Sequence, residues 1–292
     1  MGYGHSVPIG TKNIAVIGLF VLKGLKESSP AFQCWARQDF EMLVTILGSA
    51  SGLPEANRAH ASLALHNKER IVLLDAGEGA CSALARWGLD PLKLKKIYIT
   101  HTHPDHCVGL FMILQYLHMK RHRKRLDIYL PEDALPAFQP FMNQLYLVRG
   151  EINPDFRLLP LRKKHTITRG WTLQTYPTQH LQRWQELGLP GIGTQAFAFR
   201  VSSRDRSLFY SGDIADFSDI SAVVCRRDLL VLEGAHIDIG RVVEWALETG
   251  LKRLVMTHIL PGTEALYSAL IKSAEKQDLQ IILAQDGLKL RL

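Results

Sequence analysis

Residues 95–106 read KKIYITHTHPDH, and this stretch is the most informative part of the sequence for the fold. The first six residues alternate well enough for a short buried strand rich in β-branched isoleucine. His101 and His103 then stand two positions apart, so on an extended chain their side chains point to the same side. Pro104 interrupts any regular element. The pattern predicts a buried strand that ends in paired histidines.

The same stretch gathers four side chains that are able to bind metal. Asp105 and His106 come after Pro104 and open an apolar helical run, CVGLFMILQYLHM. Ligands at positions i, i+2, i+4 and i+5 cannot share one helix face, but they can converge from a strand end, a turn and a helix start. That arrangement suits two neighbouring metal ions better than one. A polar loop with incidental histidines is the alternative.

The composition is that of an ordinary globular protein. Of the 292 residues, 47% are hydrophobic and 22% are charged. The net charge of +7 and the pI of about 9.2 favour anionic partners such as RNA, nucleotides or phosphoesters, although charge alone fits simple solubility equally well. The four cysteines have no CxxC spacing, which argues against a disulfide framework or zinc ribbon and is consistent with a cytoplasmic location.

The first 41 residues differ from the rest. Residues 14–22 form an apolar run that is too short to span a bilayer, and Lys23 makes it a poor signal peptide. A weak export or membrane-surface signal is the alternative. Because Met42 begins the well-patterned stretch MLVTILGSASG, we predict a dispensable extension over residues 1–41 and one domain over residues 42–292, without stable membrane insertion.

Apolar segments of two kinds alternate along the predicted domain. Strands are predicted over residues 42–47, 61–65, 71–74, 95–100, 126–130, 156–161, 172–176, 197–201, 208–210, 229–232, 254–256 and 281–283. Helices are predicted over residues 81–88, 105–119, 132–147, 240–248 and 264–276. This order predicts an α/β protein with two mixed β-sheets flanked by helices, an αββα sandwich.

Three more candidate ligands end apolar strands. His180 follows TLQTYPTQ, Asp213 ends LFYSGD, and His258 follows LVMT. A single histidine in such a place is more often structural, but these three accompany the dense HTHPDH motif. Seven nitrogen and oxygen ligands without a cysteine fit two divalent ions, with Zn²⁺ as the first choice and Mn²⁺ or Fe²⁺ as alternatives.

The sequence resembles proteins with the metallo-β-lactamase fold. Among these it resembles ribonuclease Z, the tRNA 3′-processing endonuclease. The opening LGSASGLPEANRAHASLAL is similar to the family's first block. The stretch LLDAGEGACSALARWGLDPLKLKKIYITHTHPDHCVGL is similar to its second, and the SGD and TH signatures are also present. The resemblance extends from Met42 to the C-terminus.

The resemblance implies two sets of metal ligands joined by a shared carboxylate. These are His101, His103 and His180 for the first ion, Asp105, His106 and His258 for the second, and Asp213 as the bridge. A hydroxide between the ions would be the nucleophile, and the ions would also clamp the phosphoryl oxygens. Asp105 is thereby expected to serve catalysis as well as metal binding.

A proton donor for the leaving group is also implied. His236, in LVLEGAHID, lies at a spacing before the TH strand that is similar to that of the family's catalytic histidine. Glu233 precedes it by three residues and is expected to orient its ring. The alternative is that His236 merely starts a helix beside Asp238.

The chain departs from ribonuclease Z in several motifs. The loop motif PxKxRN reads PEANRA at residues 54–59, the HEAT motif reads LEGA and keeps only Glu233, and the HST motif reads HID. The loop LQRWQELGLPGIG is too short for the family's tRNA-gripping arm. KRHRKR, residues 120–125, either contacts phosphates or is a solvated helix end.

These observations predict a dinuclear metal-dependent hydrolase, most simply a phosphodiesterase of the ribonuclease Z type. Its substrate is expected to be an anionic phosphodiester, either the 3′ end of tRNA or a smaller molecule such as a cyclic nucleotide or cyclic phosphate. Hydrolysis of an ester, thioester or aryl sulfate on the same metals is the alternative, and a non-catalytic binding protein is a third option. The sequence leaves the metal identity open, and also whether the protein is a homodimer.

Overall fold

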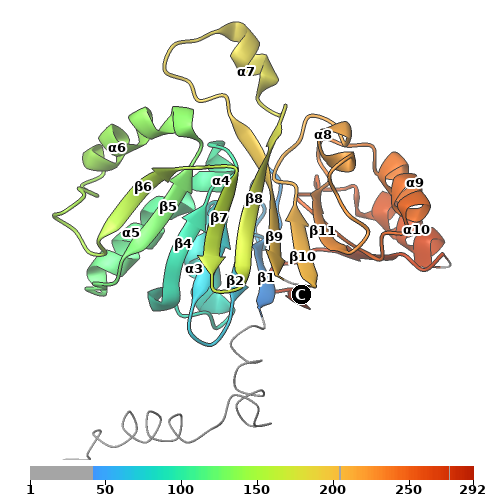
Figure 1. The fold of residues 1–292 in the computed structure, drawn as a ribbon, viewed down its shortest axis with the longest axis horizontal. Coiled ribbons are helices and arrows are strands. Elements are labelled where there is room, and N and C mark those ends of the chain that lie inside the picture. Colours follow the sequence, from blue (N-terminus) through green and yellow to red (C-terminus); the bar gives the residue numbers. More distant parts are fainter. Residues whose placement is uncertain (1–41, 204, 276) are drawn as a thin grey trace, which may run out of the picture. The chain divides into compact units, whose positions relative to one another are not determined.

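The computed structural model describes residues 42–292 except residues 204 and 276 (Figure 1). Within this range the strands form two seven-stranded sheets. The first sheet contains, in order, β14 (Lys289–Arg291), β1 (Leu43–Gly48), β2 (Ser62–His66), β3 (Ile71–Leu74), β4 (Leu94–Tyr98), β5 (Leu126–Leu130) and β6 (Phe156–Pro160). The second contains β13 (Gln280–Leu283), β12 (Arg253–Thr257), β11 (Asp228–Glu233), β10 (Arg206–Tyr210), β9 (Ala196–Ser203), β8 (Trp171–Thr178) and β7 (Lys164–Thr168).

Each sheet is part antiparallel and part parallel. Strands β3 to β6 run parallel in the first sheet, and strands β10 to β13 run parallel in the second. Parallel neighbours need long crossover connections, and helices in these connections cover the outer faces. The longer helices are α3 (Ala80–Arg86), α5 (Gly109–Met119), α6 (Leu135–Gln144), α9 (Ile239–Thr249) and α10 (Glu264–Glu275). The prediction of two mixed sheets is confirmed.

Three apolar layers hold these elements together. A central cluster lies between the sheets and includes Tyr98, Trp171 and Phe199. A second cluster lies where α3 and α5 pack on the first sheet, and a third lies where α9, α10 and the short α8 (Ser218–Ser221) cover the second. The order helix, sheet, sheet, helix follows from these layers, and the predicted αββα sandwich is confirmed.

Several short elements were not predicted from the sequence, among them α8, β7, β14 and α7 (Gln182–Leu187). β7 reads KHTIT and lies at a sheet edge, and β14 has only three residues, so neither shows a clear apolar pattern. The prediction that the chain's last strand lies at residues 281–283 was therefore wrong, because β14 follows and pairs with β1. The short helix α7 occupies the loop between β8 and β9, where no helix was predicted.

The helical run after HTHPDH is divided in two. Pro104 stands at the first position of α4 (Pro104–Cys107), where its fixed φ suits a helix start, and α5 begins at Gly109. Gly109 allows a close approach, because a Cβ there would lie 2.0 Å from the carbonyl oxygen of Gly77. The backbone N–H of Gly109 donates to Ala76 at 2.9 Å, so α5 is fixed to the glycine-rich turn after β3.

The predicted extension over residues 1–41 lies outside the described residues. Its dispensability therefore remains a prediction. Among the described helices, none combines the length and apolar character needed to cross a bilayer.

Candidate metal centre

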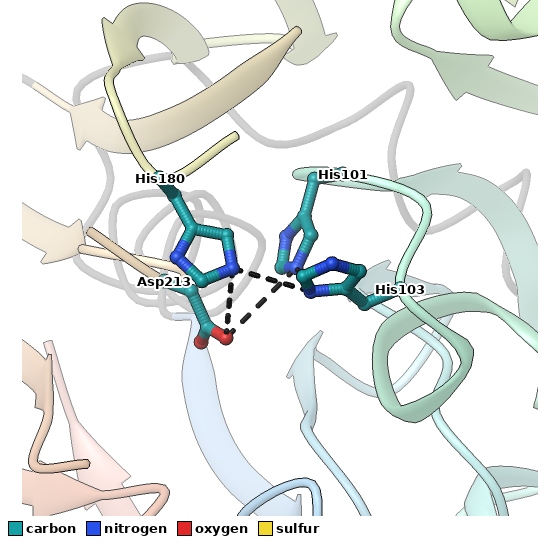
Figure 2. A group of neighbouring side chains, drawn as sticks. All are labelled: His101, His103, His180 and Asp213. Carbon is teal, nitrogen blue, oxygen red and sulfur yellow. Dashed lines mark hydrogen bonds and ion pairs between the residues drawn. The ribbon is translucent and has the colours of Figure 1, made fainter. Parts of the chain in front are cut away.

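The first group of metal-competent side chains comes from three strand ends. Figure 2 shows His101, His103 and His180 with their rings turned toward one another and toward Asp213. Nδ1 of His103 lies 3.1 Å from Nε2 of His101 and 3.2 Å from Nε2 of His180. Oδ2 of Asp213 lies 3.6 Å from Nε2 of His180 and 3.9 Å from Nε2 of His101. Four potential ligand atoms therefore surround one small volume.

The second group shares Asp213 with the first. Oδ1 of Asp213 lies 3.2 Å from Nε2 of His106, while its Oδ2 lies 3.5 Å from Nε2 of His258. Oδ2 of Asp105 completes the group, 3.5 Å from His106 and 3.7 Å from His258. All seven ligands expected from the sequence are thus brought together, in the two sets that the resemblance implied.

The spacing and burial of these atoms fit divalent ions. Tetrahedral ligands with bonds of about 2.0 Å lie about 3.3 Å apart, close to the observed separations. Nε2 of His106 and Oδ1 of Asp213 are buried, and among the described residues neither has a hydrogen-bond partner of good geometry. Buried polar atoms are normally paired, so these two atoms are accounted for if they are metal ligands.

Burial keeps the three histidines of the first group in the neutral form that binds metal. Burial lowers the pKa of His101 and of His103, and it lowers the pKa of His180 to about 4. The neighbouring His106 lowers the pKa of His101 further. Burial opposes ionisation of Asp213, but His106 and His258 hold the pKa of its carboxyl well below its usual value. Neutral imidazoles around a charged carboxylate make a suitable donor set for Zn²⁺.

Asp75 supports the second group and was missed in the sequence. Its buried carboxylate accepts hydrogen bonds from Nδ1 of His106 at 2.8 Å, the Tyr210 hydroxyl at 2.8 Å and the Thr100 backbone N–H at 2.7 Å. A carboxylate on the second ring nitrogen fixes the orientation of a ligating histidine. Asp75 directly follows an apolar strand, the signal used for His180 and Asp213, but it begins the glycine-rich sequence DAGEG, which is typical of a turn.

His236 and Glu233 lie next to the two groups without belonging to either. The ring centroid of His236 is 5.1 Å from that of His180 and 6.2 Å from that of His258. Nδ1 of His236 lies 3.3 Å from Oε1 of Glu233, whose side chain is buried at the end of β11. Asp238 caps α9 by accepting from Gly240, so the alternative that His236 starts this helix is wrong.

Arg58, in the loop after β1, forms hydrogen bonds that stabilise this loop. Arg58 donates to the backbone oxygen of Ser49 at 2.5 Å and to its hydroxyl at 3.1 Å, and it pairs with Glu55 at 2.9 Å. The Ser49 oxygen also accepts from the backbone N–H of His258 at 3.0 Å. The arginine that survives from the PxKxRN pattern therefore ties this loop to the strand end that carries His258.

The basic run at residues 120–125 is remote from the two groups. It follows the C-terminal end of α5, whose eleven residues rise about 16 Å from the start of the helix near the site. His122 is buried, and Arg125 pairs with Asp155 at 3.2 Å. A role in contacting a phosphate chain remains a prediction.

Sequence comparison assigns the chain to a family. Residues 42–233 match the family described as Anti-Pycsar protein Apyc1, about two thirds of the chain. The chain belongs to this family. The match includes every expected ligand except His258, and it ends at Glu233.

Proteins named ribonuclease Z are also similar to this chain. The enzyme of Pyrococcus furiosus is 36% identical over 229 residues, covering 66% of this chain and 75% of that protein. The enzyme of Methanothermobacter thermautotrophicus is 26% identical over 265 residues, covering 75% and 86%. The resemblance to ribonuclease Z is confirmed, and the protein is a metal-dependent hydrolase of the ribonuclease Z and phosphodiesterase type.

The fold also has a close match among solved structures. The metallo-β-lactamase fold protein YhfI from Bacillus subtilis superposes with a TM-score of 0.68 at 20% identity, covering 86% of this chain and all of that one. At this identity the likeness shows the fold alone, and it confirms the metallo-β-lactamase architecture expected from the sequence.

Proposed function

We propose that the protein is a dinuclear phosphodiesterase that acts on small phosphodiesters. The observation that carries the dinuclear site is the placement of Asp213. Its Oδ1 faces His106 at 3.2 Å in one group, and its Oδ2 faces His180 at 3.6 Å in the other. A carboxylate between two ligand sets is suited to bridging two ions. Zn²⁺ is the first choice for these donors, with Mn²⁺ or Fe²⁺ as alternatives.

Divalent ions bound there would supply an activated water as the nucleophile and offset the charge that develops on the phosphoryl oxygens. The chain's own residues supply the rest. His101, His103 and His180 present ring nitrogens from one side, and Asp105, His106 and His258 present their ligand atoms from the other. Asp75 holds the His106 ring by its Nδ1. These residues would hold the ions at fixed positions, and a phosphodiester bound to the ions would be oriented accordingly.

His236 is proposed as the proton donor to the leaving oxygen. Its Nδ1 side faces Glu233, so Nε2 on the opposite side of the ring is the atom left to donate. Contact with Glu233, against the opposing effect of burial, raises the pKa of His236, and a protonated imidazole is the form that an acid catalyst needs. The backbone N–H groups of Ala235 and His236 donate to Oε2 of Glu233 at 2.7 and 3.0 Å, which fixes the carboxylate.

The short loop between β8 and β9 favours a small substrate. This loop spans residues 179–195 and contains only the six-residue helix α7. The tRNA-gripping arm of ribonuclease Z would occupy this interval in a protein that follows that pattern fully. A cyclic nucleotide, a cyclic phosphate or another compact phosphodiester needs no such arm, whereas cleavage at the 3′ end of tRNA would require other contacts.

A substrate panel tests this proposal. Metal-loaded protein is assayed on bis(p-nitrophenyl) phosphate, a 2′,3′-cyclic nucleotide, an unprocessed tRNA, a thioester and an aryl sulfate. The proposal predicts that kcat/KM is highest for one of the two small phosphodiesters. Faster turnover of the thioester or the sulfate would contradict the reaction class. Efficient cleavage of the tRNA would contradict the substrate size.

A further inference from the structure

The end of the domain opposite the metal centre is rich in basic side chains. The parallel strands β3 to β5 and β10 to β12 begin there, whereas candidate ligands follow the ends of such strands, as His101 does for β4 and His258 for β12. A basic residue precedes or opens each of these six strands, in the order Arg70, Lys93, Arg125, Arg206, Arg227 and Lys252. We call this end of the domain the basic edge.

Cations crowd together where the first sheet begins. Burial lowers the pKa of Lys95, and the neighbouring Lys124 and Arg70 lower it further. Arg70 donates to the hydroxyl of Thr168, and within the described part of the chain none of these three cations forms an ion pair with an acidic side chain. Like charges at short range repel one another, so an anionic partner would stabilise this arrangement.

A cavity of about 530 Å³ lies where the second sheet begins. Its lining includes Arg226 and Arg227, which are exposed and form no ion pair with any residue that the structure describes. The lining also includes two acidic residues, the exposed Asp205 and the buried Asp228, but Asp228 already pairs with Arg200 at 2.9 Å. Two arginines without acidic partners beside a hollow are suited to a phosphate group.

The chain enters the domain between these two groups of cations. Leu43 pairs on one side with Arg291, whose carbonyl oxygen accepts from Arg253 in the cavity lining at 3.2 Å. On its other side Leu43 pairs with His66, which pairs in turn with the first residue of β3. The sequence before Leu43 is therefore attached to the domain at the basic edge.

That preceding sequence contains the apolar run at residues 14–22, with Lys12 and Lys23 beside it. The run is too short to cross a bilayer, but an apolar segment with basic neighbours can lie in the bilayer interface. A cluster of basic residues attracts anionic lipids, and stable attachment needs two such signals together. An RNA on the basic edge would have no use for an apolar run. The combination favours an anionic bilayer over nucleic acid.

We propose that the basic edge docks the protein on the surface of an anionic phospholipid bilayer, with residues 14–22 as a second, apolar attachment. The metal centre, at the opposite end of the sheets, then stays open to substrates in solution. This docking does not depend on the proposed phosphodiesterase function.

Co-sedimentation with lipid vesicles tests the docking. The 292-residue protein, loaded with metal, is mixed with vesicles of phosphatidylcholine, either alone or together with phosphatidylglycerol. Both lipids are phosphodiesters, so binding through the metal centre would occur on both kinds of vesicle. Docking predicts roughly 10-fold or tighter binding to the vesicles that contain phosphatidylglycerol, and weaker binding as the salt concentration rises. Equal binding to both vesicles, or to neither, would overturn the proposal.

Two double variants with the same loss of charge locate the contact. Arg226→Ser with Arg227→Ser is expected to weaken binding roughly 10- to 30-fold, because each basic residue at an anionic surface contributes about fivefold. Lys163→Ser with Arg183→Ser removes two exposed cations beyond the other ends of the strands, and binding should stay within about twofold. Thermal unfolding shows that each variant is folded. Equal losses in the two variants would overturn the basic edge as the docking surface.

A change in the apolar run separates a bilayer from a nucleic acid. Leu19→Ser with Phe20→Ser keeps every charge, and it is expected to weaken vesicle binding roughly 10-fold or more through the loss of buried apolar area. Binding of tRNA is measured in parallel by calorimetry. Vesicle binding unchanged by this variant would overturn the second attachment, and binding of the wild type to tRNA in preference to both vesicles would overturn the choice of a bilayer.

Discussion

Nδ1 of His236 lies 3.3 Å from Oε1 of Glu233, and Oε2 of the same carboxylate accepts the backbone N–H of His236 at 3.0 Å. Glu233 is only 1% exposed, whereas His236 is 41% exposed. The buried carboxylate thus accepts the backbone N–H of His236 and lies beside Nδ1 of its ring, next to the metal centre. This pairing is the structural basis for separating proton donation from metal binding.

Replacement of His236 should affect the leaving group and spare the metals. His236→Ala is expected to lower turnover roughly 10²- to 10⁴-fold on a dinucleoside monophosphate, whose alkoxide needs a proton. The loss should be much smaller on bis(p-nitrophenyl) phosphate, because p-nitrophenolate departs unprotonated. Metal content is measured in parallel. Equal losses on both substrates would exclude the acid role, and loss of metal would make His236 a ligand.

Glu233→Gln should give a milder form of the same pattern. Glutamine keeps an oxygen to accept the N–H groups of Ala235 and His236, but it removes the negative charge beside Nδ1. We expect a smaller loss of turnover than in His236→Ala, again concentrated on the poor leaving group. Turnover and thermal unfolding are both measured. A loss larger than that in His236→Ala, with unchanged stability, would mean that Glu233 has a separate catalytic role.

Asp75→Asn should weaken metal binding without removing a ligand. The variant places an amide where His106, Tyr210 and Thr100 now share one carboxylate. Loss of such a partner typically costs roughly 10- to 100-fold in metal affinity, measurable by competition with a chelator. Tyr210→Phe removes one of these contacts and should cost less. Wild-type affinity in Asp75→Asn would show that the carboxylate does not support the site.

A chain that begins at Met42 should fold and turn over substrate like the full chain. The first described strand starts at Leu43 and pairs on both sides, with β2 and with β14, so both of its edges are occupied by described residues. Thermal unfolding and kcat/KM on bis(p-nitrophenyl) phosphate are compared with those of the 292-residue protein. Aggregation or loss of activity in the shorter chain would show that residues 1–41 are needed.

The sequence predicted which metal-competent side chains lie together, because each of them except Asp105 and His106 in α4 follows an apolar strand. His180, Asp213 and His258 come from separate strand ends, and the parallel pairing of β10, β11 and β12 brings the last two to one edge. Asp75 obeys the same rule but was missed, since its residues DAGEG have the composition of a turn. Its partners lie on other strands, so its role depends on tertiary contacts that are not evident along the chain.

The missed elements have a different cause. β7 and β14 are stabilised by pairing with neighbouring strands, and their own residues are polar or few. The helix α7 buries no side chain, so it has no apolar stripe from which it could be predicted. The cavity lined by α6 and the loop 179–195 likewise depends on residues that are far apart in the sequence.

Elemental analysis of the metal-loaded protein tests the central claim most directly. The shared position of Asp213 predicts two equivalents of divalent metal per chain, and His103→Ala should lose at least one of them together with turnover. At most one equivalent in the wild type after full loading would contradict the dinuclear centre on which the proposed chemistry depends.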